Sequence, residues 1–111
     1  MIEFQYFEGC PNSVGTLANI KALIRDGFIN KEEVKIVEAT DPDSAEELNF
    51  QGSPTILVNG IDIYTERTPA NYSYSCRIYD IDNCKTGVLT KEYIRDKIQK
   101  LAGRMHLRVI G

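Results

Sequence analysis

The hydrophobic period changes abruptly near the start of the chain, and this change constrains the fold more than any other feature of the sequence. Residues 2–6 alternate apolar and polar side chains, and this period of two predicts a strand. From Pro11 to about Asp26, apolar residues recur every three or four positions, which predicts a helix with proline in its first turn. The apolar face of this helix comprises Val14, Leu17, Ile20, Leu23, Ile24 and Phe28. A strand that passes directly into a helix predicts an α/β fold.

A second strand and a second helix follow. Residues 34–39 contain Val34, Ile36 and Val37 and are predicted to form the strand. Asp41 is suited to cap a helix and Pro42 to occupy its first position, so a short helix is predicted from there to about Asn49.

The second half of the chain begins with a buried strand and a hairpin. Residues 55–58 are almost continuously apolar, which is typical of a central strand covered on both faces. Asn59-Gly60 is a strong hairpin signal and predicts an antiparallel partner over residues 61–64. Residues 65–87 show no clear periodicity, and a loop of this length is often functional. A last helix is predicted over residues 90–103.

The predicted element order is βαβαββα. The two strand–helix–strand crossovers predict parallel pairing, and the hairpin adds an antiparallel pair. We therefore expect an α/β fold with a mixed, roughly four-stranded sheet and helices on both faces. A chain of 111 residues suits a single domain. We assign the domain to residues 1–103 and expect the tail, residues 104–111, to form an extra strand or a frayed end.

Composition excludes several function classes. Lysine and arginine total 13 against 16 aspartate and glutamate residues, and a net charge of −3 argues against a nucleic-acid partner. No apolar run approaches the roughly 18–20 residues of a membrane span, so no membrane partner is expected. The N-terminus lacks the basic stretch and apolar core of a signal peptide, which predicts a cytoplasmic location.

The three cysteines are Cys10, Cys76 and Cys84. An odd number in a chain without a signal peptide predicts free thiols, or a redox pair with one cysteine to spare, or buried structural residues. A single histidine excludes a zinc site of the two-cysteine, two-histidine kind. The sequence predicts no cofactor.

Cys10 is the first candidate site residue, because it lies between the first strand and the first helix. The free N–H groups and the dipole at a helix N-terminus stabilise a thiolate and lower the pKa of a cysteine. A thiolate attacks disulfides and binds soft metals. The alternative is a small buried cysteine that happens to begin a helix.

Pro54 is the second candidate, because it follows Gly52-Ser53 and directly precedes the predicted central strand. Its peptide bond is either cis or trans, and the local sequence alone favours trans.

These two sites and the element order together resemble the thioredoxin fold over about residues 1–102. Proteins of that fold carry a C-x-x-C or C-x-x-S motif after the first core strand and a cis-proline before the third. The matching segments here are Cys10-Pro11-Asn12-Ser13 and Ser53-Pro54-Thr55. The chain is also similar to a group of small bacterial thioredoxin-like proteins loosely linked by name to alkylmercury lyase. The residues that carry this likeness are Phe7-Glu8-Gly9-Cys10-Pro11-Asn12, Gly52-Ser53-Pro54-Thr55 and Ser75-Cys76-Arg77-Ile78-Tyr79.

The resemblance implies a cis peptide bond at Pro54 and Cys10 as a nucleophile in thiol–disulfide exchange. It also implies that the backbone around Pro54 binds a partner chain in an extended conformation, with Asn12 and Ser53 beside it. The partner would be a protein or a small-molecule thiol or disulfide.

The motif departs from the redox-active pattern at Ser13, which stands where thioredoxin has its resolving cysteine. The Ser13 hydroxyl is suited to hydrogen-bond the Cys10 thiolate, but it forms no disulfide. Cys76 becomes the resolving partner if residues 65–87 fold back toward Cys10. Alternatively, the two sulfurs bind a soft ion such as Hg(II), Zn(II) or Cu(I), or Cys76 is an isolated thiol. Arg77 has three alternative roles: it lowers the pKa of Cys76, it pairs with Glu8, or it is a solvated surface residue.

Three functions follow from these residues. The first is thiol–disulfide exchange with Cys10 as nucleophile and Cys76 as resolving thiol. The second is binding of a soft metal ion by the same two sulfurs. The third is a non-catalytic interaction module, for which the Cys10 pKa would equal that of a free thiol.

Overall fold

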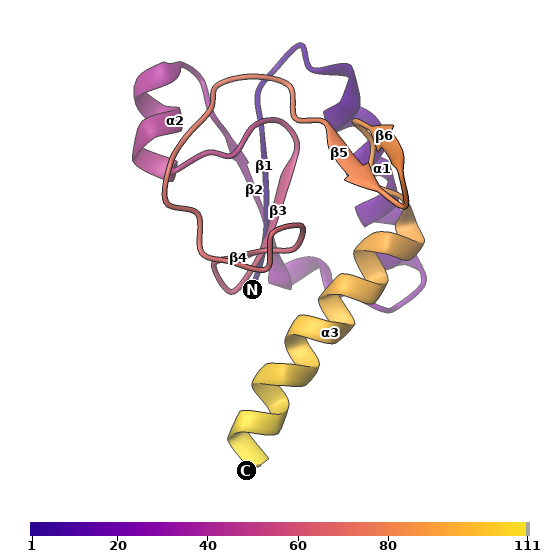
Figure 1. The fold of residues 1–111 in the computed structure, drawn as a ribbon. Helices are drawn as coiled ribbons and strands as arrows, with labels where there is room; N and C mark the ends of the chain where they lie inside the picture. The colour runs from indigo at the N-terminus through magenta and orange to yellow at the C-terminus, as the bar shows by residue number, and fades with distance from the viewer. Residues whose placement is uncertain (111) are drawn as a thin grey trace.

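A mixed four-stranded sheet forms the centre of the molecule (Figure 1). The structure is a computed structural model that describes the backbone of residues 1–110 and the side chains of residues 1–102. The strand order is β2-β1-β3-β4. The strands are β1 (Ile2–Tyr6), β2 (Val34–Glu38), β3 (Thr55–Val58) and β4 (Ile61–Asp62). The helices are α1 (Pro11–Arg25), the short 3-10 helix η1 (Lys31–Glu33), α2 (Pro42–Leu48) and α3 (Lys91–Ile110). The predicted α/β class and the mixed sheet of four strands are confirmed.

The direction of β3 differs from the prediction. β1 pairs with β2 in parallel, as the first crossover predicts, but β3 runs antiparallel to β1. α2 has only seven residues and spans about 10 Å, so it does not return the chain along the sheet. β3 therefore begins at Thr55, opposite Gln5, beside the edge where β2 ends at Glu38.

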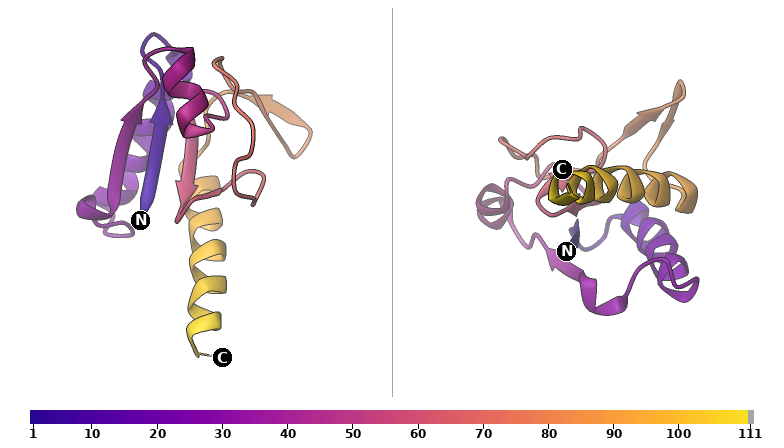
Figure 2. Two further views of the ribbon diagram at one scale, coloured as in Figure 1. Left: turned by 90° about the vertical axis from the view of Figure 1, so that its left-hand side faces the viewer. Right: turned by 90° about the horizontal axis from the view of Figure 1, so that it is seen from below.

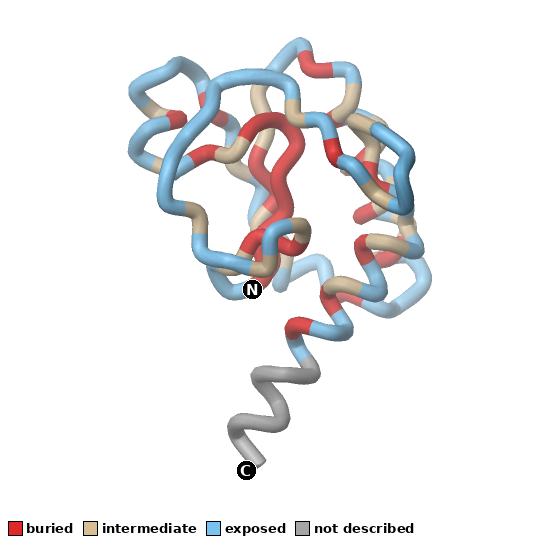
Figure 3. The backbone as a smooth tube through the Cα atoms, viewed as in Figure 1, coloured by how far each residue is buried: buried red, intermediate tan, exposed pale blue. Residues whose placement is uncertain are grey.

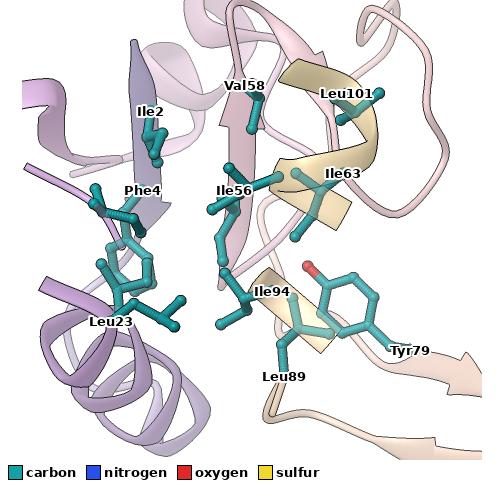
Figure 4. Close-up of a cluster of buried hydrophobic side chains, with 13 residues drawn as sticks. Ile2, Phe4, Leu23, Ile56, Val58, Ile63, Tyr79, Leu89, Ile94 and Leu101 are labelled. Carbon is teal, nitrogen blue, oxygen red and sulfur yellow. The ribbon is translucent and has the colours of Figure 1, made fainter. Parts of the chain in front are cut away.

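Helices lie on both sides of the sheet (Figures 1 and 2). α1 and α3 pack on one face and enclose the larger core, which Figure 4 shows. This core joins Phe4 and Ile56 of the sheet to Leu23 of α1 and Ile94 of α3. α2 lies on the other side with a small cluster of its own, made of Ala39, Ala45 and Phe50. Figure 3 shows that the central buried stretch runs through β3, where residues 52–58 are all buried.

The first two helices begin where the sequence predicts. The first residue of α1 is Pro11, and the first residue of α2 is Pro42. The Asp41 side chain caps α2 by accepting a hydrogen bond from the backbone N–H of Ser44 at 2.8 Å. The sequence identifies these starts because capping and proline at the first turn are local signals.

The buried face of α1 is rotated from the predicted one. Val14, predicted to be buried, is 72% exposed, whereas Thr16 is fully buried. The Thr16 hydroxyl accepts a hydrogen bond from the backbone N–H of Leu89 at 3.2 Å, so its polar atom is satisfied inside the protein. Ser13 and Thr16 therefore occupy inward positions that the hydrophobic pattern assigns to apolar residues.

α3 is longer than predicted. It continues through Gly103 to Ile110, so residues 104–110 of the predicted tail are helical and do not form the extra strand. A glycine inside a helix costs about 1 kcal/mol relative to alanine and does not by itself end the helix. Gly111 lies outside the described residues. In the part of the chain that the structure describes, no helix combines the length and the apolar character needed to cross a bilayer.

The segment between β4 and α3 contains a hairpin that the hydrophobic pattern does not predict. Strands β5 (Tyr79–Ile81) and β6 (Cys84–Thr86) pair antiparallel around Asp82-Asn83. Both turn residues have positive φ angles, 52° and 64°, which aspartate and asparagine adopt more readily than most residues. Before the hairpin, the chain pairs with Ser53 through Cys76 and so passes beside Cys10, the N-cap residue of α1.

Candidate functional site

Two of the predicted site segments meet at one edge of the sheet. Because β1 and β3 are antiparallel, the end of β1 and the start of β3 lie side by side. Cys10 follows β1, and Ser53-Pro54 precedes β3. The Ser53-Pro54 peptide bond is cis, in agreement with the resemblance and against the local preference. The topology therefore brings the cysteine and the proline together.

Cys10 is buried and its sulfur is surrounded by hydrogen-bonding groups. It is the N-cap residue of α1 and only 2% exposed, and its Sγ lies 3.5 Å from the Ser53 carbonyl oxygen. Burial on its own raises the pKa of the Cys10 thiol, but hydrogen bonds outweigh burial and hold this pKa below the ordinary thiol value. The groups responsible are, in falling order, the Ser53 side chain, the Ser13 backbone, the Cys76 thiol and the Asn12 backbone.

Cys76 faces Cys10 from the segment that precedes β5. Its Sγ lies 3.7 Å from the Cys10 Sγ and donates a hydrogen bond to it. This hydrogen bond is the largest cause that raises the pKa of Cys76, followed by burial and by the charge of Cys10. The arrangement favours a thiolate at Cys10 and a protonated thiol at Cys76. Both cysteines are free, Cys10 buried and Cys76 exposed.

Backbone pairing with Ser53 positions Cys76. Ser53 and Cys76 form a parallel bridge, in which the Ser53 N–H donates to the Ser75 carbonyl at 2.8 Å and the Arg77 N–H donates to the Ser53 carbonyl at 2.9 Å. Gly52 permits this close approach: a Cβ there would lie 3.0 Å from the Arg77 Cβ, and its φ of +111° disfavours other residues. The Gly-Ser-Pro-Thr segment thus holds residues 75–77 against the start of β3.

The Arg77 side chain anchors this segment in the protein interior. Its guanidinium lies 2.7 Å from a carboxylate oxygen of Asp62, which is 1% exposed, and donates to the Thr55 hydroxyl at 3.0 Å. It also lies over the rings of Tyr64 and Tyr79, 5.4 and 4.8 Å from their centres. The predicted effects of Arg77 are therefore wrong: its partner is Asp62 rather than Glu8, and the pKa of Cys76 is raised.

Two tyrosines of residues 65–87, Tyr74 and Tyr79, contact groups near the candidate site. Tyr79 is buried, and its hydroxyl donates to the Pro54 carbonyl. Tyr74 packs on Phe7, with ring centres 5.2 Å apart, while Tyr72 is 46% exposed.

The other predicted motif residues contribute mainly through their backbone. The Ser13 hydroxyl donates to the Cys10 carbonyl oxygen at 2.8 Å, so its proton is directed at the backbone and not at the sulfur. Asn12 directs its side chain against Gly87, where a Cβ would lie 2.0 Å from the amide nitrogen. The Asn12 side chain therefore packs against the segment that leads into α3.

A shallow hollow of about 500 Å³ lies beside the N-terminus of α1. It is lined by Tyr6, Glu8, Gly9, Cys10, Pro11, Ser13 and Val14. The exposed Val14 contributes apolar surface to it, a feature that the predicted burial of Val14 missed.

Cys84 is the third cysteine of the chain. Cys84 is exposed and free on β6. Among the described residues, no group of three or more histidine, cysteine, aspartate or glutamate side chains is arranged to hold a metal ion. The Cys10–Cys76 pair is thus the cysteine chemistry that the fold assembles.

Sequence reasoning identified the two sulfurs but missed the residues that hold them together. Asp62 lies in no motif, and Thr55 lies in the Gly-Ser-Pro-Thr motif without a predicted role; their contacts with Arg77 join positions far apart in the chain. No local signal marks such contacts.

Comparisons of the chain with models of protein families, with curated proteins and with solved structures gave no match. The geometry of the site is therefore what indicates its function.

Proposed function

We propose that this chain is a thioredoxin-like protein in which Cys10 and Cys76 form a redox pair for thiol–disulfide exchange. The observation that carries the proposal is the 3.7 Å separation of the two sulfurs, one favoured as thiolate and the other as thiol. The sheet order β2-β1-β3-β4, the cysteine at the start of α1 and the cis bond before β3 support the thioredoxin-like assignment.

The reaction proceeds by two exchange steps with a disulfide R–S–S–R. One cysteine thiolate attacks the disulfide, forms a mixed disulfide and releases R–S⁻, which takes up a proton. The second cysteine, as thiolate, then attacks the protein sulfur of the mixed disulfide, releases the second R–S⁻ and closes the Cys10–Cys76 bond. Counted from the fully protonated dithiol, the pair loses two electrons and two protons, and the disulfide becomes two R–SH molecules. The reverse sequence oxidises thiols.

Ser13 occupies the place of the second cysteine in the motif, and this is compatible with the proposed chemistry. Cys76 replaces the missing second cysteine of the motif from a distant part of the chain, and the two thiols need only approach from 3.7 Å to the bond length of about 2.05 Å.

The test uses a Cys84→Ser protein, which retains only the two cysteines of the pair. The reduced protein is equilibrated with mixtures of reduced and oxidised glutathione, quenched with acid and mapped by mass spectrometry. We expect a Cys10–Cys76 disulfide that titrates with the glutathione ratio.

Two controls, each with a further Cys10→Ser or Cys76→Ser substitution, should form no internal disulfide and only adducts. If the Cys84→Ser protein forms no internal disulfide at ratios that oxidise a model dithiol, the proposal fails.

A soft-metal site is the second candidate, because the two facing sulfurs are also the ligands that Cu(I) and Hg(II) prefer. The pair alone supplies too few ligands for a structural zinc site. Metal titration of the reduced Cys84→Ser protein should give one ion per chain. Binding that survives Cys76→Ser would contradict this candidate.

A further inference from the structure

We infer that Cys76, and not Cys10, is the sulfur that exchanges with the partner, while Cys10 is the buried sulfur that opens and closes the internal disulfide. This inference rests on the proposed function and reverses the roles that the C-x-x-S motif predicts. It assigns the mixed disulfide to a residue outside the motif.

The two cysteines differ in their exposure to solvent. An attacking sulfur must reach the target sulfur from solvent. Cys10 is 2% exposed, and its sulfur lies between the Ser53 carbonyl and the Cys76 sulfur. Cys76 is exposed, on the segment that pairs with Ser53. Cys10 also lines the shallow hollow beside α1, but its small exposed fraction leaves the sulfur covered.

The backbone N–H and C=O of Ser53 are already hydrogen-bonded within the chain. A partner chain in extended conformation would need the N–H and C=O of Ser53 to align its own sulfur with Cys10. Both groups are already bonded to Ser75 and Arg77 of the same chain. Residues 75–77 thus take the place of an extended partner, and Cys76 takes the place of the partner's cysteine. An external thiol meets this segment first.

The chemistry of the leaving group agrees with this order. When a thiolate R–S⁻ attacks the Cys76 sulfur of the internal disulfide, the R–S–Cys76 bond forms and the Cys10–Cys76 bond breaks. The electron pair of the broken bond leaves on Cys10, whose pKa the Ser53 side chain and the backbone of the first turn of α1 hold below the ordinary thiol value. Attack on Cys10 would instead expel Cys76, which lies on the segment before β5 and not at the N-terminus of a helix. A second R–S⁻ then attacks the partner sulfur, releasing R–S–S–R and the Cys76 thiolate.

The first experiment locates the mixed disulfide. The Cys84→Ser protein is oxidised to the internal disulfide, mixed with a limiting amount of reduced glutathione, quenched with acid at early times and mapped by mass spectrometry. Adducts on Cys76 should exceed those on Cys10 by about tenfold or more. Adducts mainly on Cys10 would overturn this inference and leave the redox pair intact, whereas failure to form the internal disulfide would overturn both.

A second measurement separates access from pKa. Alkylation by iodoacetamide is followed against pH in Cys76→Ser/Cys84→Ser, which retains Cys10, and in Cys10→Ser/Cys84→Ser, which retains Cys76. At high pH each thiol is fully ionised, so the plateau rates no longer depend on the fraction of thiolate. They reflect access and intrinsic nucleophilicity, and the latter falls only about threefold for each unit by which the pKa is lowered. The plateau rate of Cys10 should be lower by about tenfold or more. Equal plateau rates would contradict the inference.

Discussion

The close approach of residues 75–77 to Gly52 gives a prediction with a matched control. In Gly52→Ala, the new Cβ would lie 3.0 Å from the Arg77 Cβ and 3.1 Å from the Ser75 carbonyl oxygen, at a φ of +111°. The backbone conformation costs about 1–3 kcal/mol for a residue with a side chain. Crowding against the neighbouring segment adds about 1–3 kcal/mol. The control is Gly27→Ala, where φ is +80° and nothing lies within 4 Å of the Cβ, so only the first cost applies.

Urea unfolding and oxidation by glutathione together test this prediction. The free energy of unfolding should fall in both variants, and by about 1–3 kcal/mol more in Gly52→Ala than in Gly27→Ala. Only Gly52→Ala should also slow formation of the internal disulfide, because the new methyl group displaces the segment that carries Cys76. Equal losses of stability with equal rates of oxidation would refute the assignment of Gly52 as the residue that positions this segment.

Two further predictions concern the charges at the site. In the Cys84→Ser background, the alkylation rate of Cys10 should reach its midpoint at a pH below that of an ordinary thiol, since the pKa is lowered. Cys76→Ala removes the hydrogen-bond donor and should raise this midpoint; an unchanged midpoint would show that Cys76 does not stabilise the thiolate. Asp62→Asn leaves the Arg77 charge buried without its partner and should reduce the free energy of unfolding by about 3–5 kcal/mol in urea. The matched change Asp26→Asn breaks an exposed ion pair and should have a much smaller effect; similar losses would contradict the importance of burial.

The elements that the sequence predicts correctly are those with local signals. Pro42 and Asp41 specify the start of α2, and Asn59-Gly60 adopts the two positive φ angles of the predicted hairpin. The direction of β3 was predicted incorrectly, because it depends on the length of α2 and not on the pattern of β3 itself. The exposed position of Val14 likewise follows from a tertiary contact, the hydrogen bond between Thr16 and Leu89.

The candidate site also contains residues that local sequence signals identify and residues that they do not. Cys10 and Pro54 stand next to recognisable strand and helix boundaries, so their positions follow from the chain near them. Cys76 lies 66 positions from Cys10, in a segment without periodicity. Its location depends on the buried ion pair between Arg77 and Asp62, which no pattern of charges in the sequence reveals.

Under the proposed function, the long separation between the two cysteines links the redox state of the pair to the stability of the fold. A disulfide between positions 66 apart closes a long loop in the unfolded chain, and loop entropy gives it a stabilising effect of about 4 kcal/mol. By linkage, the folded protein favours the internal disulfide over the unfolded chain by the same amount. The contacts that hold Cys76 beside Cys10, namely its bridge to Ser53 and the Arg77 ion pair, are the source of this preference. A change that loosens them therefore weakens the fold and shifts the pair toward its reduced form.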